Sequence, residues 1–272
     1  MRKLVLNSII SKNLSLKDEV RVIADTGWDG IFTGWSGKGS LKEFAEEAEK
    51  NGLYYQSVHA PFGGAAKLWD EGTAGDDEVN RLTDCLRDTA KIGVDLVIMH
   101  AIIGFDKFTP TELGVRRFEK LFDEAERLGI RIALENTEGE CYLEKLMEAS
   151  KGRKNVGFCI DTGHEMCYNY SKDLIGKYSG RVIATHLNDN MKITGERITF
   201  HDDAHMMPFD GLADWQGIAD RLKSAGYEGP LTFELTQYPK PEKHTHDIYQ
   251  SLDDRQFIEL AFEKAKKFRE MF

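Results

Sequence analysis

Residues 157–164 read GFCIDTGH, and this stretch is the most informative part of the chain. An apolar run ends in Asp161, a turn residue follows, and His164 stands three positions after the aspartate. This pattern is typical of a buried strand that carries two metal-ligand side chains at its carboxyl end. Asp161 and Thr162 can equally cap a helix that begins near His164. A ligand role and a capping role are both open from this stretch alone.

The arrangement of a short strand followed by a helix recurs along the whole chain. The expected strands are residues 3–10, 30–32, 54–59, 95–100, 130–135, 156–161, 182–186 and 230–234. The expected helices are residues 16–26, 41–50, 80–92, 111–128, 142–149, 165–178, 214–224 and 253–272. Strands that alternate with helices pair in parallel through right-handed crossovers. Eight such units close most economically into a (β/α)8 TIM barrel, and we expect one α/β domain over residues 1–272.

An open doubly wound sheet is the alternative fold, but no GxGxxG motif follows the first strand to favour it. The formal net charge of −10 disfavours a nucleic-acid partner, because an acidic surface repels polyanions. No segment approaches the roughly 20 apolar residues of a membrane span, and the N-terminal apolar run is too short for a signal peptide. The four cysteines form no CxxC pair, so we expect reduced thiols and a cytoplasmic protein.

Ionisable side chains gather at the expected carboxyl ends of the strands, namely at His59, His100, Glu135, Asp161, His164, His186 and Glu234. Six of the eight histidines lie at these ends or in the loop after the seventh strand. The two in that loop are His201 and His205. In a barrel these strand ends form one rim, which is where the active site lies. Carboxylates and imidazoles buried together would repel one another or lose solvation without a cation between them. The sequence therefore predicts a metal site.

The inner set of this group is Glu135, Asp161, His186 and Glu234, which offers three carboxylates and one imidazole. Such mixed ligands suit one divalent ion, and Mn²⁺, Mg²⁺, Co²⁺ and Zn²⁺ all remain open. A substrate bound through two adjacent oxygens would complete the coordination, and the ion would then stabilise an enediolate. Glu135 and Glu234 are the candidates to remove and return the proton alpha to the carbonyl.

Seven segments, SVHAPF, VIMHA, IALEN, CIDTGH, ATHLNDN, DAHMMPFDGLADW and LTFE, resemble the successive motifs of the xylose isomerase-like TIM barrels. Within that group the chain is most similar to the sugar phosphate isomerase/epimerase proteins, over about residues 54–236. The resemblance implies a divalent-metal-dependent isomerase or epimerase that acts on a small sugar. It also implies that Glu135, Asp161, His186 and Glu234 hold the metal and that the two glutamates double as acid and base.

The resemblance also implies substrate contacts. His164 would face the substrate oxygens, and Lys192 stands near the position where related members carry an arginine after the seventh-strand histidine. Trp35, which follows the second strand, can form an apolar wall of the substrate site or part of the core. A homo-oligomer is left open.

The same superfamily contains endonuclease IV-type nucleases, which use three zinc ions at abasic DNA. Their pattern maps onto the four ligands above and, as additional metal or substrate-binding residues, onto His59, His100, His164, Asp203 and His205. Two or three Zn²⁺ ions would then be bound. The rim loops lack the clustered arginines and lysines that neutralise phosphates, which disfavours DNA. A sugar dehydratase and a sugar-binding barrel without turnover are the remaining alternatives.

Overall fold

The computed structural model describes residues 1–8, 10–191, 193 and 195–272. Its strands are β1 Leu4–Asn7, β2 Gly30–Gly34, β3 Tyr54–His59, β4 Leu96–His100, β5 Arg131–Glu135, β6 Val156–Asp161, β7 Val182–His186 and β8 Leu231–Phe233. Its α-helices are α1 Leu16–Thr26, α2 Lys42–Lys50, α3 Thr73–Lys91, α4 Glu112–Leu128, α5 Glu140–Ala149, α6 Thr162–Cys167, α7 Leu174–Lys177, α8 Trp215–Ser224 and α9 Asp254–Arg269. Short 3-10 turns are η1 Ala65–Trp69, η2 Phe200–Asp202 and η3 Asp247–Tyr249.

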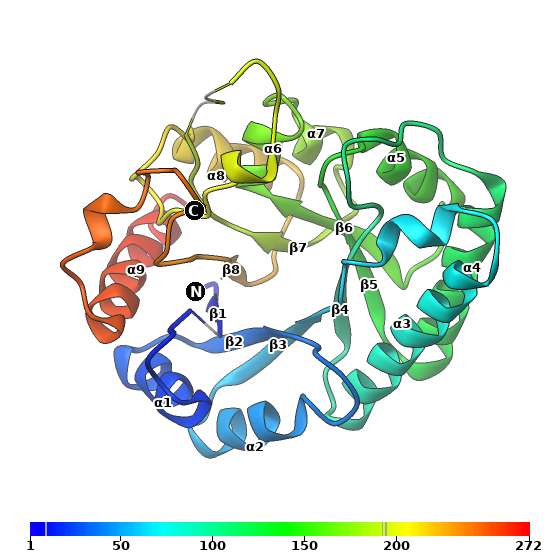
Figure 1. Cartoon of the computed structure of the whole chain (residues 1–272). Helices are drawn as coiled ribbons and strands as arrows, with labels where there is room; N and C mark the ends of the chain where they lie inside the picture. Colours follow the sequence, from blue (N-terminus) through cyan, green and yellow to red (C-terminus); the bar gives the residue numbers. More distant parts are fainter. Residues whose placement is uncertain (9, 192, 194) are drawn as a thin grey trace.

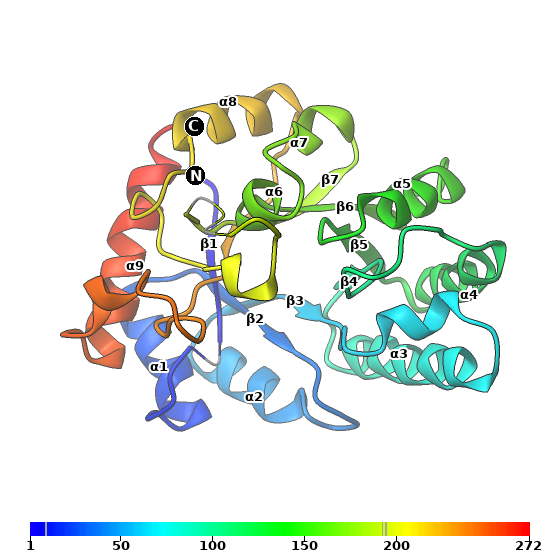
Figure 2. The same cartoon turned by 45° about the horizontal axis from the view of Figure 1, so that its top comes forward.

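The strands form one parallel sheet in the order β7-β6-β5-β4-β3-β2-β1-β8. A parallel bridge between Leu187 and Phe233 joins the two ends, and the Leu187 amide donates to the Thr232 carbonyl at 2.8 Å. The helices make a ring around the strands, as the two views in Figures 1 and 2 show. The predicted (β/α)8 barrel is confirmed.

Helix α4 shows how the outer layer follows from the sequence. The Thr111 side chain accepts a hydrogen bond from the Gly114 amide at the start, and Gly129 ends the helix in the left-handed region with φ 70°. Between these caps an apolar stripe at helical spacing is buried against the sheet, formed by Val115, Phe118, Leu121, Phe122 and Ala125. Capping and amphipathicity together fix this helix on the outside of the barrel.

The pleat of the strands decides which side chains enter the barrel, because alternate residues point to opposite faces. Inside β4 to β7 a small apolar cluster is formed by Leu96, Ile98, Ala133, Cys159 and Ala184. The next positions of the same parity along these strands are His100, Glu135, Asp161 and His186. A dry apolar layer therefore lies directly beneath a layer of ionisable side chains.

One helix prediction was wrong. The expected helix over residues 165–178 is split into α6 and α7, since Tyr170 and Ser171 adopt positive φ values of 55° and 54° between them. The cause is two separate caps: the Asp161 carboxylate accepts from the His164 amide, and the Asp173 carboxylate accepts from the Gly176 amide. Each aspartate begins a helix of its own, which the weak apolar pattern did not reveal.

Helix α3 begins at Thr73, earlier than the expected residue 80. The prediction missed this start because the first turns of the helix are charged and lack an apolar stripe. The buried partner of this segment comes from α4: Arg117 contacts the backbone that precedes α3, which no local pattern could show. The described part of the chain contains no helix with the length and apolar content required to span a bilayer. All four cysteines are free thiols, and Cys159 is buried in the barrel.

Candidate metal centre

Glu135, Asp161, His186 and Glu234 meet at the carboxyl end of the barrel. Each offers a ligand atom, and these atoms all lie within 4.8 Å of one another. His186 Nδ1 lies 2.8 Å from Oε1 of Glu135 and 3.1 Å from Oε2 of Glu234. The structure thus brings together the four residues that the sequence predicted as one ligand set.

Burial removes these charged groups from water, which disfavours their ionised forms. Burial raises the pKa of Asp161 to about 6, although His164 and His205 partly oppose the shift. Burial also opposes ionisation of Glu135, but the charge of His186 and hydrogen bonds from three histidines hold its pKa well below the usual range. Burial lowers the pKa of His186, and the charges of Glu135 and Glu234 outweigh it and raise that pKa well above 6.5.

This balance fits a cation site. The raised pKa values of His186 and His164 favour protonated imidazoles beside the carboxylates, and a divalent ion would replace those protons. Several buried polar atoms also have no hydrogen-bond partner in the described part of the chain, among them His186 Nε2, His100 Nδ1 and Asp203 Oδ1. Buried polar atoms without partners beside three carboxylates are an expected feature of a metal centre.

A second group shares Glu135 with the first. His59 Nε2 lies 3.1 Å and His100 Nε2 3.2 Å from Oε2 of Glu135, and these three residues form a further candidate ion-binding group. His59 Nδ1 donates to the Ala60 carbonyl at 2.7 Å, which orients Nε2 toward Glu135. Glu135 therefore presents one oxygen to His186 and the other to the His59–His100 pair.

A third group lies on the other side of Asp161. Ligand atoms of Asp161, His164 and His205 converge, and Asp203 Oδ2 lies 3.3 Å from His164 Nε2 and 2.9 Å from His205 Nε2. His164 Nδ1 donates to the Asn136 carbonyl at 2.9 Å, which orients Nε2 toward Asp203. All the additional metal or substrate-binding residues predicted from the sequence thus surround the central four.

The GFCIDTGH stretch builds a helix cap from a carboxylate that also belongs to the candidate ligand group. Asp161 Oδ1 accepts from the His164 amide at 2.7 Å, and Oδ2 accepts from Asn188 Nδ2 at 2.8 Å. Gly163 makes the second contact possible, because a Cβ at this position would lie 2.0 Å from Asn188 Oδ1. The capping interpretation and the ligand interpretation of Asp161 are therefore compatible, since one carboxylate can serve both.

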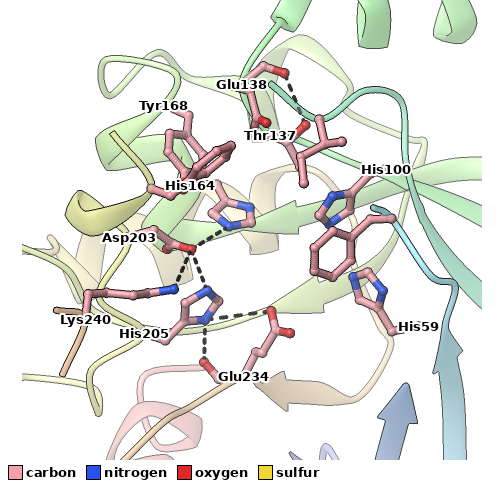
Figure 3. Close-up of a pocket in the computed structure, with 13 residues that line it drawn as sticks. His59, His100, Thr137, Glu138, His164, Tyr168, Asp203, His205, Glu234 and Lys240 are labelled. Carbon is pink, nitrogen blue, oxygen red and sulfur yellow. Dashed lines mark hydrogen bonds and ion pairs between the residues drawn. The ribbon is translucent and has the colours of Figure 1, made fainter. Parts of the chain in front are cut away.

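A cavity of about 290 Å³ opens onto these residues (Figure 3). Of the candidate ligands, His59, His100, His164, Asp203, His205 and Glu234 line it. Aromatic rings also line the cavity. Phe62 stacks on His100 with ring centroids 4.7 Å apart, and the ring centroids of Tyr168 and His164 are 4.9 Å apart. The volume is close to the lower end of small-molecule sites, about 300 Å³, and suits a single small ligand.

Sequence reasoning missed several lining residues, namely Phe62, Thr137, Glu138, Tyr168 and Lys240. Among the described residues that line the cavity, Lys240 is the only lysine or arginine, and its Nζ lies 3.9 Å from Asp203 Oδ2. Glu138 follows Glu135, the last residue of β5, by three positions. This proximity to a strand end was the one sequence feature that could have indicated a place at the cavity.

Two predicted substrate contacts have a different outcome. Trp35 is 8% exposed, packs in the main hydrophobic core and donates from Nε1 to Asp88 Oδ2 at 3.0 Å. It is not among the described residues that line the cavity, so the core alternative describes its place in the structure. The other predicted contact, Lys192, lies outside the described residues.

The chain is similar in sequence to a curated protein of unknown function. The chain is 28% identical over 204 residues to the uncharacterized protein y4fM of Sinorhizobium fredii, and the match covers 70% of this chain and 58% of that protein. The chain thus spans little more than half the length of that curated relative.

Among solved structures, a xylose isomerase-like TIM barrel/4-hydroxyphenylpyruvate dioxygenase fusion protein has a TM-score of 0.77 at 16% identity, over 99% of this chain and 43% of that one. D-Psicose 3-epimerase from Clostridium cellulolyticum H10 has a TM-score of 0.74 at 17% identity, over 99% of both chains. These likenesses show a shared fold. Residues 20–255 match the xylose isomerase-like TIM barrel family, and the chain belongs to that family.

Proposed function

We propose that this protein is a divalent-metal-dependent isomerase or epimerase that transfers a proton alpha to the carbonyl of a small sugar or sugar derivative. The observation that carries the proposal is the convergence of Glu135, Asp161, His186 and Glu234 on one point beneath a cavity of monosaccharide size. The sugar epimerase of the same fold supports the substrate class. The free thiols lead us to place the enzyme in the cytoplasm.

The two glutamates would divide the work. A divalent ion held by the four residues would supply Lewis acidity toward the substrate carbonyl. The Glu234 side chain is 24% exposed and lines the cavity, so it can reach a substrate proton directly. Glu135 is fully buried among three histidines, so we assign it mainly to bind the cation. Its second role would be to exchange a proton on the face of the substrate opposite Glu234. His164 would orient the substrate oxygens.

Isotope exchange tests this proposal. The protein loaded with Mn²⁺ and incubated with ketoses in D₂O should incorporate deuterium at the carbon alpha to the carbonyl. Glu234→Gln should lower that exchange by about 100-fold or more, because a positioned base contributes this much. Glu263→Gln is a matched control, since Glu263 pairs with Lys266 on α9 and lies away from the cavity. Absence of exchange across a broad ketose panel would rule out the isomerase and epimerase assignment.

A second candidate function is phosphodiester cleavage at abasic DNA by a centre with more than one ion. The observation that favours it is Glu135, which belongs both to the central group and to the His59–His100 group. Two observations disfavour it: the formal net charge of −10, and a single lysine among the described residues that line the cavity. A sugar dehydratase of the same superfamily is a further alternative.

Ion stoichiometry and a nuclease assay separate these candidates. One Mn²⁺ or Mg²⁺ per chain agrees with the isomerase, whereas about three Zn²⁺ would move the assignment toward the nuclease. Incision of abasic duplex DNA that Glu135→Gln abolishes would establish the second function. His100→Ala should remove one ion from a multi-ion centre and leave the count of a single-ion centre unchanged, because His100 belongs only to the second group.

A further inference from the structure

Glu138 is a buried carboxyl group that faces the cavity without belonging to the metal centre. It lies in the loop between β5 and α5, is 6% exposed, and lines the cavity beside Thr137, His164 and Tyr168. It is a member of none of the candidate ion-binding groups that the described residues form. Figure 3 shows Glu138 and Thr137 on one side of the pocket and Glu234 and His205 on the other.

The partners of Glu138 within the protein are few. Its Oε1 accepts a hydrogen bond from the Gly104 amide, which ties the loop after β5 to the loop after β4. Burial raises the pKa of Glu138, the hydrogen bond from the Gly104 amide partly opposes this shift, and the charges of His164 and Asp203 act on it in opposite directions. No lysine or arginine in the described part of the chain forms an ion pair with it. The carboxyl group thus lies at the cavity wall with capacity for further hydrogen bonds.

A carboxyl group in this situation selects the chemistry of its ligand. Polar groups removed from water require hydrogen-bond partners, and hydroxyl groups supply donors that match a carboxylate. A phosphate or carboxylate of a ligand at the same place would meet like charge in a poorly solvated site. Lys240 does not offset this repulsion, because it lies beside Asp203 on the other side of the pocket in Figure 3.

We propose that Glu138 binds a hydroxyl group of the substrate on the side of the cavity opposite Glu234, and that it thereby selects neutral sugars over sugar phosphates and sugar acids. This inference rests on the proposed function, because it names the substrate class of the same site. Glu138 acts here as a specificity residue, while the proton transfer stays with Glu135 and Glu234.

One substitution separates this role from a structural one. Glu138→Gln keeps an acceptor oxygen for the Gly104 amide, so the tie between the two loops is preserved while the carboxyl group is lost. The matched control is Glu140→Gln, since Glu140 stands two positions later and pairs with Lys172 and Lys177 instead of lining the cavity. Metal content and melting temperature should be the same in both variants and the original protein.

The experiment is calorimetric titration of the full-length protein, loaded with Mn²⁺, with neutral ketohexoses and with their 6-phosphates. The original protein should bind a neutral ketohexose more tightly than its phosphate. Glu138→Gln should weaken binding of the neutral sugar by about 10- to 100-fold, as loss of a hydrogen bond to a charged group does. It should also bring the two dissociation constants closer together, and Glu140→Gln should change neither.

Three results would overturn the inference: equal affinity of Glu138→Gln and the original protein for the neutral sugar, tighter binding of the phosphate by the original protein, or no binding of any sugar in the panel. Deuterium exchange by the original protein separates this inference from the proposed function. Exchange with unchanged sugar affinity in Glu138→Gln would contradict only the role of Glu138. Weakened binding in that variant without any exchange would support Glu138 and contradict proton transfer.

Discussion

His186 Nδ1 lies 2.8 Å from Oε1 of Glu135, and both side chains are fully buried at the mouth of the barrel. The pair comes from β7 and β5, which are separated by β6 in the sheet. Neither residue can be solvated by bulk water, so each depends on the other or on an ion between them. This relationship makes Glu135 the most sensitive position for tests of metal binding.

Metal should stabilise the protein, and Glu135→Gln should abolish that effect. Saturation at about 100 times the dissociation constant adds about 2.7 kcal/mol to the free energy of unfolding. For a chain of this size we expect the melting temperature to rise by about 5–10 °C with Mn²⁺ and to fall back with a chelator. Glu140→Gln should respond to Mn²⁺ like the original protein. A rise of the same size in Glu135→Gln would show that Glu135 holds no ion.

Gly163→Ala should weaken metal binding although Gly163 has no side chain to bind with. The added Cβ would lie 2.0 Å from Asn188 Oδ1 and displace the amide that donates to Asp161. Loss of such a support costs about 10- to 100-fold in metal affinity, which competition with a fluorescent chelator measures. Gly63→Ala is the control, since a Cβ there meets nothing within 4 Å. Equal affinities in the two variants would argue against Asp161 as a ligand.

Arg117→Ala should destabilise the fold far more than Arg116→Ala. The guanidinium of Arg117 is buried and donates to the carbonyls of Leu68, Asp70 and Gly72, which hold the segment around η1. Its loss leaves several acceptors unsatisfied, and we expect a decrease of about 3 kcal/mol or more in the free energy of unfolding.

Arg116 is exposed on the same helix, so its replacement should cost at most about 0.5 kcal/mol. Urea denaturation followed by circular dichroism measures both values. Similar costs for the two variants would mean that the segment around η1 is held by other contacts, such as the hydrogen bond from Trp69 Nε1 to the Ala101 carbonyl.

Glu124 should contribute to stability in a defined pH range. Hydrogen bonds from Arg127 and Arg87 outweigh the effect of burial and lower its pKa from 4.5 to about 2. A group with a lowered folded pKa stabilises the protein above its unfolded pKa, and the contribution disappears as the pH falls from about 4.5 to about 2. Solvent screening limits the contribution to about 1 kcal/mol.

The comparison of Glu124→Gln with the original protein checks this window. The difference in the free energy of unfolding should be present at pH 7 and vanish near pH 2. Glu126→Gln serves as control, because Glu126 has only a 3.8 Å contact with Arg153 and no resolved hydrogen bond to it. A difference that persists unchanged at low pH would refute an electrostatic origin.

Local pattern was enough to predict the barrel and the bounds of several strands, although the first strand ends at Asn7 and not at the expected residue 10. The strands over residues 54–59, 156–161 and 182–186 begin and end where the alternation and flanking turns indicated. Glu135, Asp161 and His186 could be grouped from sequence alone, because parallel strands in a barrel bring their carboxyl ends to one rim. The split of the helix over residues 165–178 could not be predicted, since two aspartate caps compete with a continuous helical pattern.

The sequence by itself determined the fold class and the set of side chains at the rim, because these follow from periodicity and from residues placed at strand ends. The family was indicated by the resemblance of seven motifs to the xylose isomerase-like TIM barrels. Only the tertiary structure decided that Trp35 packs against Asp88 in the core and that Glu138 faces the cavity. The physical reason is that both residues lie in connections after strands, where no periodic constraint sets the direction of a side chain. Contacts with segments distant in the sequence, Asp88 in α3 and Gly104 after β4, set it instead.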